Sequence, residues 1–185
     1  AITPMGRQHE NDREATAADL KWLADPAEEP EPFGDGGTKM AWNTFNVVSI
    51  YPNGNPVMSD VNQRWVGDCC ACAVIASMAY LYPRFVKHII KDNMDKTYTV
   101  TMYDPKGKQI SVGVGGDYFI GNSGDLGALG GRNKEVTWAT ILEKAMIKWN
   151  QIYQGSSNVG GIGTEYVSAI FTGDGESVGF GANAL

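Results

Sequence analysis

Several features that would place this chain in a large functional class are missing from its sequence. It has no cluster of basic residues, and 15 Lys and Arg against 21 Asp and Glu give a net charge of −6. Such a chain has no electrostatic attraction for nucleic acid or for an anionic membrane surface, so we expect neither as a partner. No apolar run reaches the roughly 18 residues that a membrane-spanning helix needs. The first twelve residues do not predict a signal peptide, and the compartment stays open.

Cysteine and histidine are scarce as well. The chain of 185 residues holds three cysteines and two histidines. The cysteines, at 69, 70 and 72, lie too close together for a disulfide framework. We therefore do not expect a small disulfide-bonded scaffold, and the thiols need another explanation.

The remaining composition is that of a globular protein with an unusual N-terminal part. A hydrophobic share of 43% is enough for one sizeable core. Residues 11–25 predict a short helix, with Asn11 or Asp12 as N-cap and Leu20 and Leu23 on one side. An acidic, proline-broken stretch follows. We predict that residues 1–40 form an acidic arm, either a solvated tail or a pro-segment-like docking arm, and that residues 41–185 form the folded lobe.

Three helices are predicted in this lobe. Residues 71–82 are apolar nearly all round, which is typical of a central helix buried on most faces, with Asp68 as N-cap and Pro83 ending or kinking it. Residues 138–153 have apolar side chains at helical spacing on one face, and Thr137 precedes them as a cap. Residues 164–171 predict a short helix that Gly173 closes.

The β-structure predicted for the lobe is small. Residues 42–51 indicate an irregular strand. Residues 97–103 and 108–114 flank the turn former DPKG and predict a β-hairpin. The glycine-rich stretch 113–135 predicts a long loop, and long loops in compact domains are often functional. The sequence therefore predicts an α+β fold, a helical Cys-bearing lobe with a small β-hairpin and long loops.

One thiol has the surroundings of a nucleophile. Cys69 follows the expected cap Asp68, so it opens a helix whose N-terminal partial charge favours a thiolate. The Cys69 N–H and the side-chain amide of Gln63 are suited to binding an oxyanion. Gly67 lets the backbone turn sharply and approach a substrate. This combination is more specific than a lone cysteine.

The alternatives for the three cysteines are a metal site and simple packing. A metal site needs soft ligands that converge, and Cys69, Cys70 and Cys72 are crowded on one helix while His9 and His88 are distant in sequence. Cys70 and Cys72 are better interpreted as small buried hydrophobic residues.

Three separate motifs carry a resemblance to a known family. QRWVGDC followed by AVIASMA resembles the active-site segment of calpain-type cysteine peptidases, which reads Gln-Gly-x-x-Gly-Asp-Cys-Trp before an Ala-rich helix. WATILEKAMIKWNQIY resembles their Trp-x-Ala-Leu-Leu-Glu-Lys-Ala-Tyr-Ala-Lys helix, and the glycine pair at 160–161 and AIFTGDG match later landmarks. The resemblance runs from about Trp42 to Gly175. Arg64 and Cys70 depart from it, because they stand where the family has Gly and Trp.

The resemblance implies the Cys-bearing lobe of a papain-like fold. Cys69 would be the nucleophile and Gln63 the oxyanion donor. The substrate site would include Gly67, Asp68 and the glycine pair Gly160 and Gly161, of which Gly161 would pair its backbone with an extended peptide by strand addition.

The resemblance also implies a calcium site. The family holds this ion between the loop before the Gln and a glutamate just before the second helix. Asp60 and Glu135 stand at comparable places, with backbone oxygens near Asn53 and Gly54. Calcium is therefore an expected cofactor.

A cysteine peptidase also needs a histidine and a residue that orients it, and the chain lacks the family's Gly-His and Asn-Pro-Trp segments. His88 would lie roughly 28 Å from Cys69 along a continuous helix. Two hypotheses follow. The first is the Cys-bearing chain of a two-chain endopeptidase, processed after about residue 185 and inactive alone, whose companion chain supplies His and Asn. The second is a non-catalytic calpain-like binding or regulatory protein.

Overall fold

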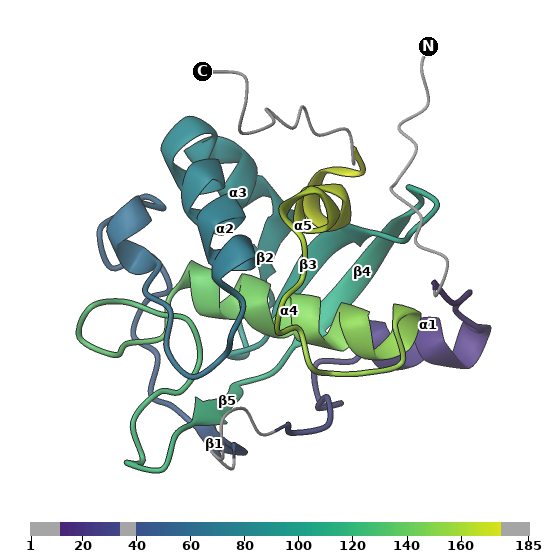
Figure 1. Cartoon of the computed structure of the whole chain (residues 1–185). Helices are drawn as coiled ribbons and strands as arrows, with labels where there is room; N and C mark the ends of the chain where they lie inside the picture. Colours follow the sequence, from purple (N-terminus) through teal and green to yellow (C-terminus); the bar gives the residue numbers. More distant parts are fainter. Residues whose placement is uncertain (1–11, 34–39, 175–185) are drawn as a thin grey trace.

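A computed structural model describes residues 12–33 and 40–174 of the chain. These residues form a mixed α+β structure with five α-helices and two small antiparallel sheets. In Figure 1 the long green helix α4 crosses the middle of the molecule, and the other helices and the larger sheet lie around it. The predicted α+β class is confirmed.

Helix α4, Trp138–Tyr153, is the centre of the fold. It has the predicted bounds, and the Thr137 hydroxyl caps it by accepting a hydrogen bond from the Ala139 N–H at 3.3 Å. The sequence predicted that one face of this helix would be buried. The helix is buried on its other faces as well, because α1, α2, β3 and β4 all contact it. Even Glu143 and Lys148 on this helix are 1% and 0% exposed. Each buried charge therefore needs a partner inside the protein.

Helix α2, Cys69–Leu81, begins directly after Asp68, as predicted. Pro83 is the first residue of helix α3, Pro83–Ile89, and the two helices are bent by 112° relative to one another. Proline suits a first helical position because its missing N–H has no partner there in any case. No single helix of the described residues is long and apolar enough to cross a membrane, and α2 and α3 pass that test only as this bent pair.

The prediction that the 71–82 helix is buried on most faces is wrong. One side of α2 packs against α4 and α5, through Ala71, Ile75, Met78 and Ala79. The C-terminal end presents exposed apolar and aromatic side chains, namely Tyr80, Leu81 and Tyr82. An apolar sequence thus produced a helix with an open side.

The larger sheet has three antiparallel strands, β2 (Ile90–Asp92), β3 (Tyr98–Tyr103) and β4 (Gln109–Val114). The β3–β4 hairpin is confirmed, with the Gly107 N–H donating to the Asp104 carbonyl at 2.9 Å. Gly107 has a φ of +80°, which favours glycine. Strand β2 was not predicted.

The second sheet pairs β1, Ala41–Thr44, with β5, Asp117–Ile120. The predicted strand over 42–51 is therefore regular only at its start. The predicted long loop over 113–135 is confirmed for residues 121–135, which contain no helix or strand, but its first part forms the end of β4 and strand β5. Trp42 and Phe119 are paired across this sheet, and their rings stack with centroids 3.8 Å apart, which holds the two strands together.

Two short helices complete the lobe. The 3-10 helix η1, Met58–Asp60, precedes the cysteine segment. Helix α5, Thr164–Thr172, ends at Gly173, whose φ of +76° is the left-handed conformation expected of a closing glycine. The predicted third helix is thus confirmed.

Helix α1, Ala17–Ala24, is capped by Thr16 in a reciprocal capping box with Asp19, so the prediction of Asn11 or Asp12 as the cap is wrong. A Thr-x-x-Asp pattern in the sequence carried the correct signal. Leu23 is fully buried, whereas Leu20 is 38% exposed.

The described part of the N-terminal segment, 12–33, lies on the core. The Trp42 indole N–H donates to the Pro30 carbonyl at 2.9 Å, and the Glu31 N–H donates to Gln151 at 2.7 Å. The Lys148 ammonium donates to the Asp25 carbonyl at 2.9 Å. The division into an arm of residues 1–40 and a lobe of residues 41–185 stays a prediction.

Candidate functional site

Cys69 is the most accessible of the three thiols. It is exposed on the first residue of α2, whereas Cys70 and Cys72 are half-buried, and all three are free. Burial, followed by the nearby Cys69, raises the pKa of the Cys70 thiol. Burial, followed by the charge of Asp68, raises the pKa of the Cys72 thiol further. Both neighbours of Cys69 are therefore poor nucleophiles at neutral pH.

Backbone hydrogen bonds hold the loop that precedes Cys69 in place. The Asn62 N–H donates to the Gly130 carbonyl at 2.9 Å, and the Trp65 N–H donates to the Gly127 carbonyl at 3.1 Å. The Gln63 side chain is exposed, and its Nε2 donates to the Val66 carbonyl at 2.8 Å. That bond uses one of the two N–H groups of the amide.

The two glycine segments predicted to bind substrate lie side by side. The Gly161 N–H donates to the Gly67 carbonyl at 3.1 Å, so the loop after α4 contacts the loop before Cys69. Gly161 has a φ of +77°, and its neighbour Gly160 donates its N–H to Asn158 Oδ1 at 2.9 Å. A shallow cavity of about 350 Å³ opens beside both glycines. Among the described residues, no backbone N–H donates to the Gly161 carbonyl.

Asp68 occupies the predicted cap position but does not cap the helix with its side chain. The carboxyl group makes no capping hydrogen bond and is 1% exposed. It turns inward, where Cys72 Sγ lies 3.4 Å from Oδ1 and the carboxyl of Glu143 on α4 lies within hydrogen-bond reach. The predicted substrate-site role of Asp68 is therefore an indirect one at most, since the side chain faces the protein interior.

Three of the four residues predicted to bind calcium, Asp60, Asn53 and Gly54, have hydrogen-bond partners from the protein. Asp60 is 2% exposed and accepts hydrogen bonds from Asn53 Nδ2 at 2.8 Å and from the Trp138 indole N–H at 2.7 Å. The Gly54 carbonyl accepts a hydrogen bond from Lys87 Nζ at 3.0 Å. Binding a metal here would require these donors to move.

Glu135 is the exception among these residues. Its carboxyl lies over Gly131, and Oε2 is buried without a partner. No group of three or more His, Cys, Asp or Glu side chains placed to hold a metal occurs within residues 12–33 and 40–174. Calcium stays a prediction that rests on Asp60 and Glu135.

The histidines are not part of this arrangement as far as the structure describes them. His88 is exposed near the end of α3, beyond the bend that separates α3 from α2. His9 lies outside the described residues. The part of the chain that the structure describes thus brings Cys69, Gln63 and the two glycine loops to one region, and contributes His88 to another.

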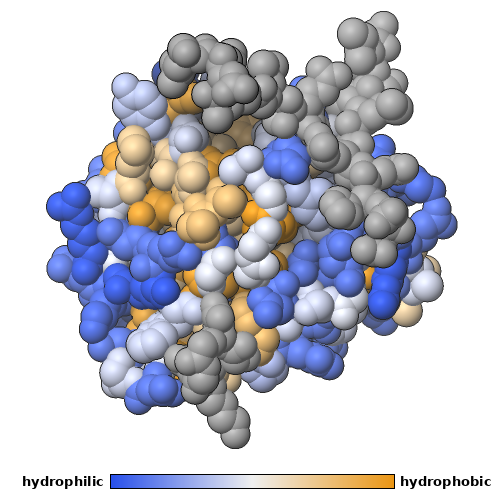
Figure 2. Space-filling model, viewed as in Figure 1, coloured by the Kyte–Doolittle hydropathy of each residue, from blue (hydrophilic) through white to orange (hydrophobic). Residues whose placement is uncertain are grey.

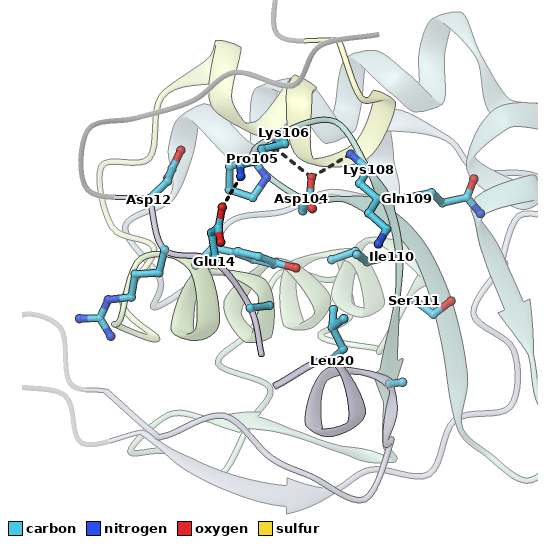
Figure 3. Close-up of a pocket in the computed structure, with 14 residues that line it drawn as sticks. Asp12, Glu14, Leu20, Asp104, Pro105, Lys106, Lys108, Gln109, Ile110 and Ser111 are labelled. Carbon is cyan, nitrogen blue, oxygen red and sulfur yellow. Dashed lines mark hydrogen bonds and ion pairs between the residues drawn. The ribbon is translucent and has the colours of Figure 1, made fainter. Parts of the chain in front are cut away.

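Sequence reasoning missed a cavity of about 540 Å³ between the N-terminal segment, α1 and the β3–β4 hairpin. In Figure 3 the Leu20 and Ile110 side chains point into it, and the ion pair of Glu14 with Lys106 crosses its rim. The buried Tyr153 hydroxyl also lines it, without a partner among the described residues. None of the predicted site residues lines this cavity.

No protein-family model and no curated protein matches this sequence. The resemblance to calpain-type peptidases therefore rests on the chain's own sequence motifs alone.

Proposed function

We propose that this chain is the Cys-bearing half of a calpain-like cysteine endopeptidase, and that a companion chain supplies the catalytic histidine and asparagine. One observation carries the proposal. Cys69 presents an exposed thiol on the first residue of a 13-residue helix, beside the contact between Gly67 and Gly161. The mixed α+β architecture is compatible with the Cys lobe of a papain-like fold, and that finer assignment belongs to the proposal.

The chemistry would follow from the position of Cys69. An imidazole of the companion chain would accept the thiol proton, and the positive end of α2 would stabilise the negative charge that develops on the sulfur. Cys69 Sγ then bonds to the scissile carbonyl carbon, and the oxyanion accepts hydrogen bonds from the Cys69 N–H and the Gln63 amide. The C–N bond breaks as the imidazolium protonates the leaving amine. Water, deprotonated by the same imidazole, hydrolyses the thioester and releases Cys69.

An extended peptide would lie along the glycine pair. Since the Gly161 N–H already donates to Gly67, the Gly161 carbonyl is the group that would accept a hydrogen bond from a substrate. The cavity of about 350 Å³ beside it has room for a side chain of that peptide.

The companion chain would cover the open side of α2. Figure 2 shows apolar residues gathered on the surface over this helix. A groove of about 400 Å³ runs between α2, α3 and α5, and its lining includes Val74, Leu81 and Phe85. Contiguous apolar surface of this kind is typical of an interface.

The test is to isolate the native protein and to identify what binds it. We expect mass spectrometry to find a companion fragment with a Gly-His motif, and we expect the complex to hydrolyse peptides. Cys69→Ala should abolish the activity, and Cys72→Ala, the matched control, should preserve most of it. Unaided hydrolysis by the single chain, or a partner bound away from Cys69, would contradict the proposal.

A second candidate is a non-catalytic calpain-like binding or regulatory protein. It is favoured by the hydrogen bonds that already occupy a Gln63 amide N–H and the Gly161 N–H. On this hypothesis the native complex binds extended peptides without cleaving them, and Cys69→Ser leaves that binding unchanged.

A further inference from the structure

Two buried carboxyl groups meet beneath the first turn of α2. Asp68, on which the helix begins, and Glu143, in the middle of α4, are each 1% exposed. The Leu129 N–H donates to Glu143 Oε1 at 3.0 Å, and Cys72 Sγ lies 3.4 Å from Asp68 Oδ1. Asp68 Oδ2 is fully buried and receives no N–H from any described residue. Besides the Cys72 thiol, which lies at Oδ1, the Glu143 carboxyl is within hydrogen-bond reach of Asp68 and can donate to Oδ2 when it is protonated.

No basic side chain neutralises this pair within the described residues. Lys144 is the next residue along α4, but its ammonium pairs with Glu29 on the other side of the helix at 2.6 Å. The other titratable group that faces the pair is the thiol of Cys72, while Cys69 follows Asp68 in the chain and is exposed. Two ionised carboxylates at this depth would repel each other with little screening. A single proton held between them removes the repulsion and gives Asp68 Oδ2 its missing donor.

The pKa directions agree with this geometry. Burial raises the pKa of Asp68, and burial together with the Asp68 charge raises the pKa of Glu143 well above its ordinary value. The hydrogen bond between the two carboxyls acts in opposite directions on the partners, because it lowers the pKa of Asp68 and raises that of Glu143. Glu143 Oε1 already accepts the Leu129 N–H whereas Asp68 Oδ2 has no donor, so a proton on Glu143 that points to Asp68 satisfies both groups.

We propose that Glu143 is a positioning residue for Cys69, which acts by donating a shared proton to Asp68 and so ties α4 to the residue on which α2 begins. The hydrogen bond fixes the first turn of α2, and with it the thiol, relative to the glycine loop at Gly161. The shared proton and its effect on the position of Cys69 do not depend on the protein being a peptidase. Only their value for catalysis rests on the proposed function.

The first test looks for the proton. In infrared spectra of the intact chain at about pH 7, we expect the carbonyl stretch of a protonated carboxylic acid. Glu143→Gln should remove the band, and Glu165→Gln, which removes a carboxylate beside Cys70, should leave it. A wild-type spectrum without the band, or a band that survives Glu143→Gln, overturns the proposal.

The second test measures Cys69. Its alkylation rate by iodoacetamide, followed by mass spectrometry, should show a second inflection with pH, because loss of the shared proton adds a negative charge at the residue that precedes Cys69 and weakens the contact that positions it. The glutamine amide of Glu143→Gln can still donate a hydrogen bond to Asp68, but it does not titrate. The alkylation rate of this variant near pH 6 should therefore equal that of the wild type, and its pH profile should lack the second inflection. Glu143→Leu removes the tie and should slow alkylation by about tenfold.

These readouts separate positioning from simple stability. A purely structural Glu143 would leave the pH profile of Cys69 unchanged in the folded Glu143→Gln protein, and that result overturns the proposal. If Glu143→Leu does not fold, Glu143→Gln and the infrared band decide by themselves. Alkylation needs no companion chain, so absence of peptidase activity in the native complex would count against the proposed function alone.

Discussion

Helices α2 and α4 show how poorly hydrophobicity alone predicts burial. The α4 sequence carries Glu143, Lys144 and Lys148, yet the helix is buried on every side. The α2 sequence has no charged residue, yet it leaves Leu81 59% exposed. The difference lies in the partners: α4 is surrounded by elements of its own chain, whereas one side of α2 faces outward. We interpret α4 as the buried core helix of the fold and α2 as a helix whose outer side is open to a partner.

The largest expected difference between the two helices is in the effect of replacing a leucine by alanine in each. Leu142→Ala in α4 should lower the free energy of unfolding by about 2–5 kcal/mol, since a fully buried leucine leaves a cavity. Leu81→Ala in α2 should change it by less than about 0.5 kcal/mol in the isolated chain. Urea unfolding of both variants measures the difference. Equal losses would mean that the exposed end of α2 already has a partner within this chain.

Thiol labelling sharpens the comparison at the N-terminal end of α2, where Cys69 is exposed. Cys69 should react with iodoacetamide at least about tenfold faster than Cys72, because burial raises the pKa of Cys72 and restricts access to it. Peptide mapping after timed labelling gives the three rates. Equal rates, or a preference for Cys72, would exclude Cys69 as the nucleophile.

The buried Lys148 makes the burial of α4 testable through the pH dependence of the free energy of unfolding. Burial lowers the pKa of Lys148 to about 8. The unfolded chain, with a lysine pKa near 10.4, therefore binds more protons than the folded one above pH 8, so stability rises with pH. Between pH 7 and 9 this contributes about 1 kcal/mol.

Lys148→Met should lose that rise, and urea unfolding at the two pH values measures it. Lys106→Met, at an exposed lysine of the hairpin, is the control and should keep the rise. An unchanged slope in Lys148→Met would show that the ammonium is less desolvated than its burial indicates.

Calcium should have the smallest effect, because Asp60 and Gly54 already have protein donors near the start of α4. At a concentration near its Kd, calcium would stabilise the chain by about 0.4 kcal/mol. Thermal unfolding with and without calcium should detect this in the wild type and not in the Asp60→Ala, Glu135→Ala double variant. Indifference of the wild type would end the calcium prediction.

The elements predicted correctly were those whose signals are local. Thr137 and the apolar spacing after it defined α4, and Asp104 with Gly107 defined the hairpin. Asp68 was placed correctly as the residue before α2. The side-chain partner of Asp68 could not be predicted, because Glu143 lies on another helix and only the tertiary fold brings the two carboxyls together.

The glycine-rich stretch indicated the loop at 121–135 correctly but not why its glycines are needed. Gly121 and Gly127 are glycine because the Trp65 side chain packs directly on them: a Cβ at Gly121 would lie 2.3 Å from Trp65 Nε1. Glycine here permits close packing beside β5, which the composition alone does not predict. The candidate nucleophile was identified from neighbouring residues alone, but the contact of Gly67 with Gly161 depends on the fold.

The ammonium group of Lys148 also has a consequence for the order in which the protein is made. It holds the Asp25 carbonyl, 123 residues earlier in the chain, and the Gly113 carbonyl. At about 5–20 residues per second, a ribosome needs roughly 6 to 25 s between those two positions. The segment that carries α1 leaves the ribosome before α4, yet its hydrogen bonds to Lys148 can form only after α4 has emerged. It is therefore among the last parts of the described fold to reach its final place.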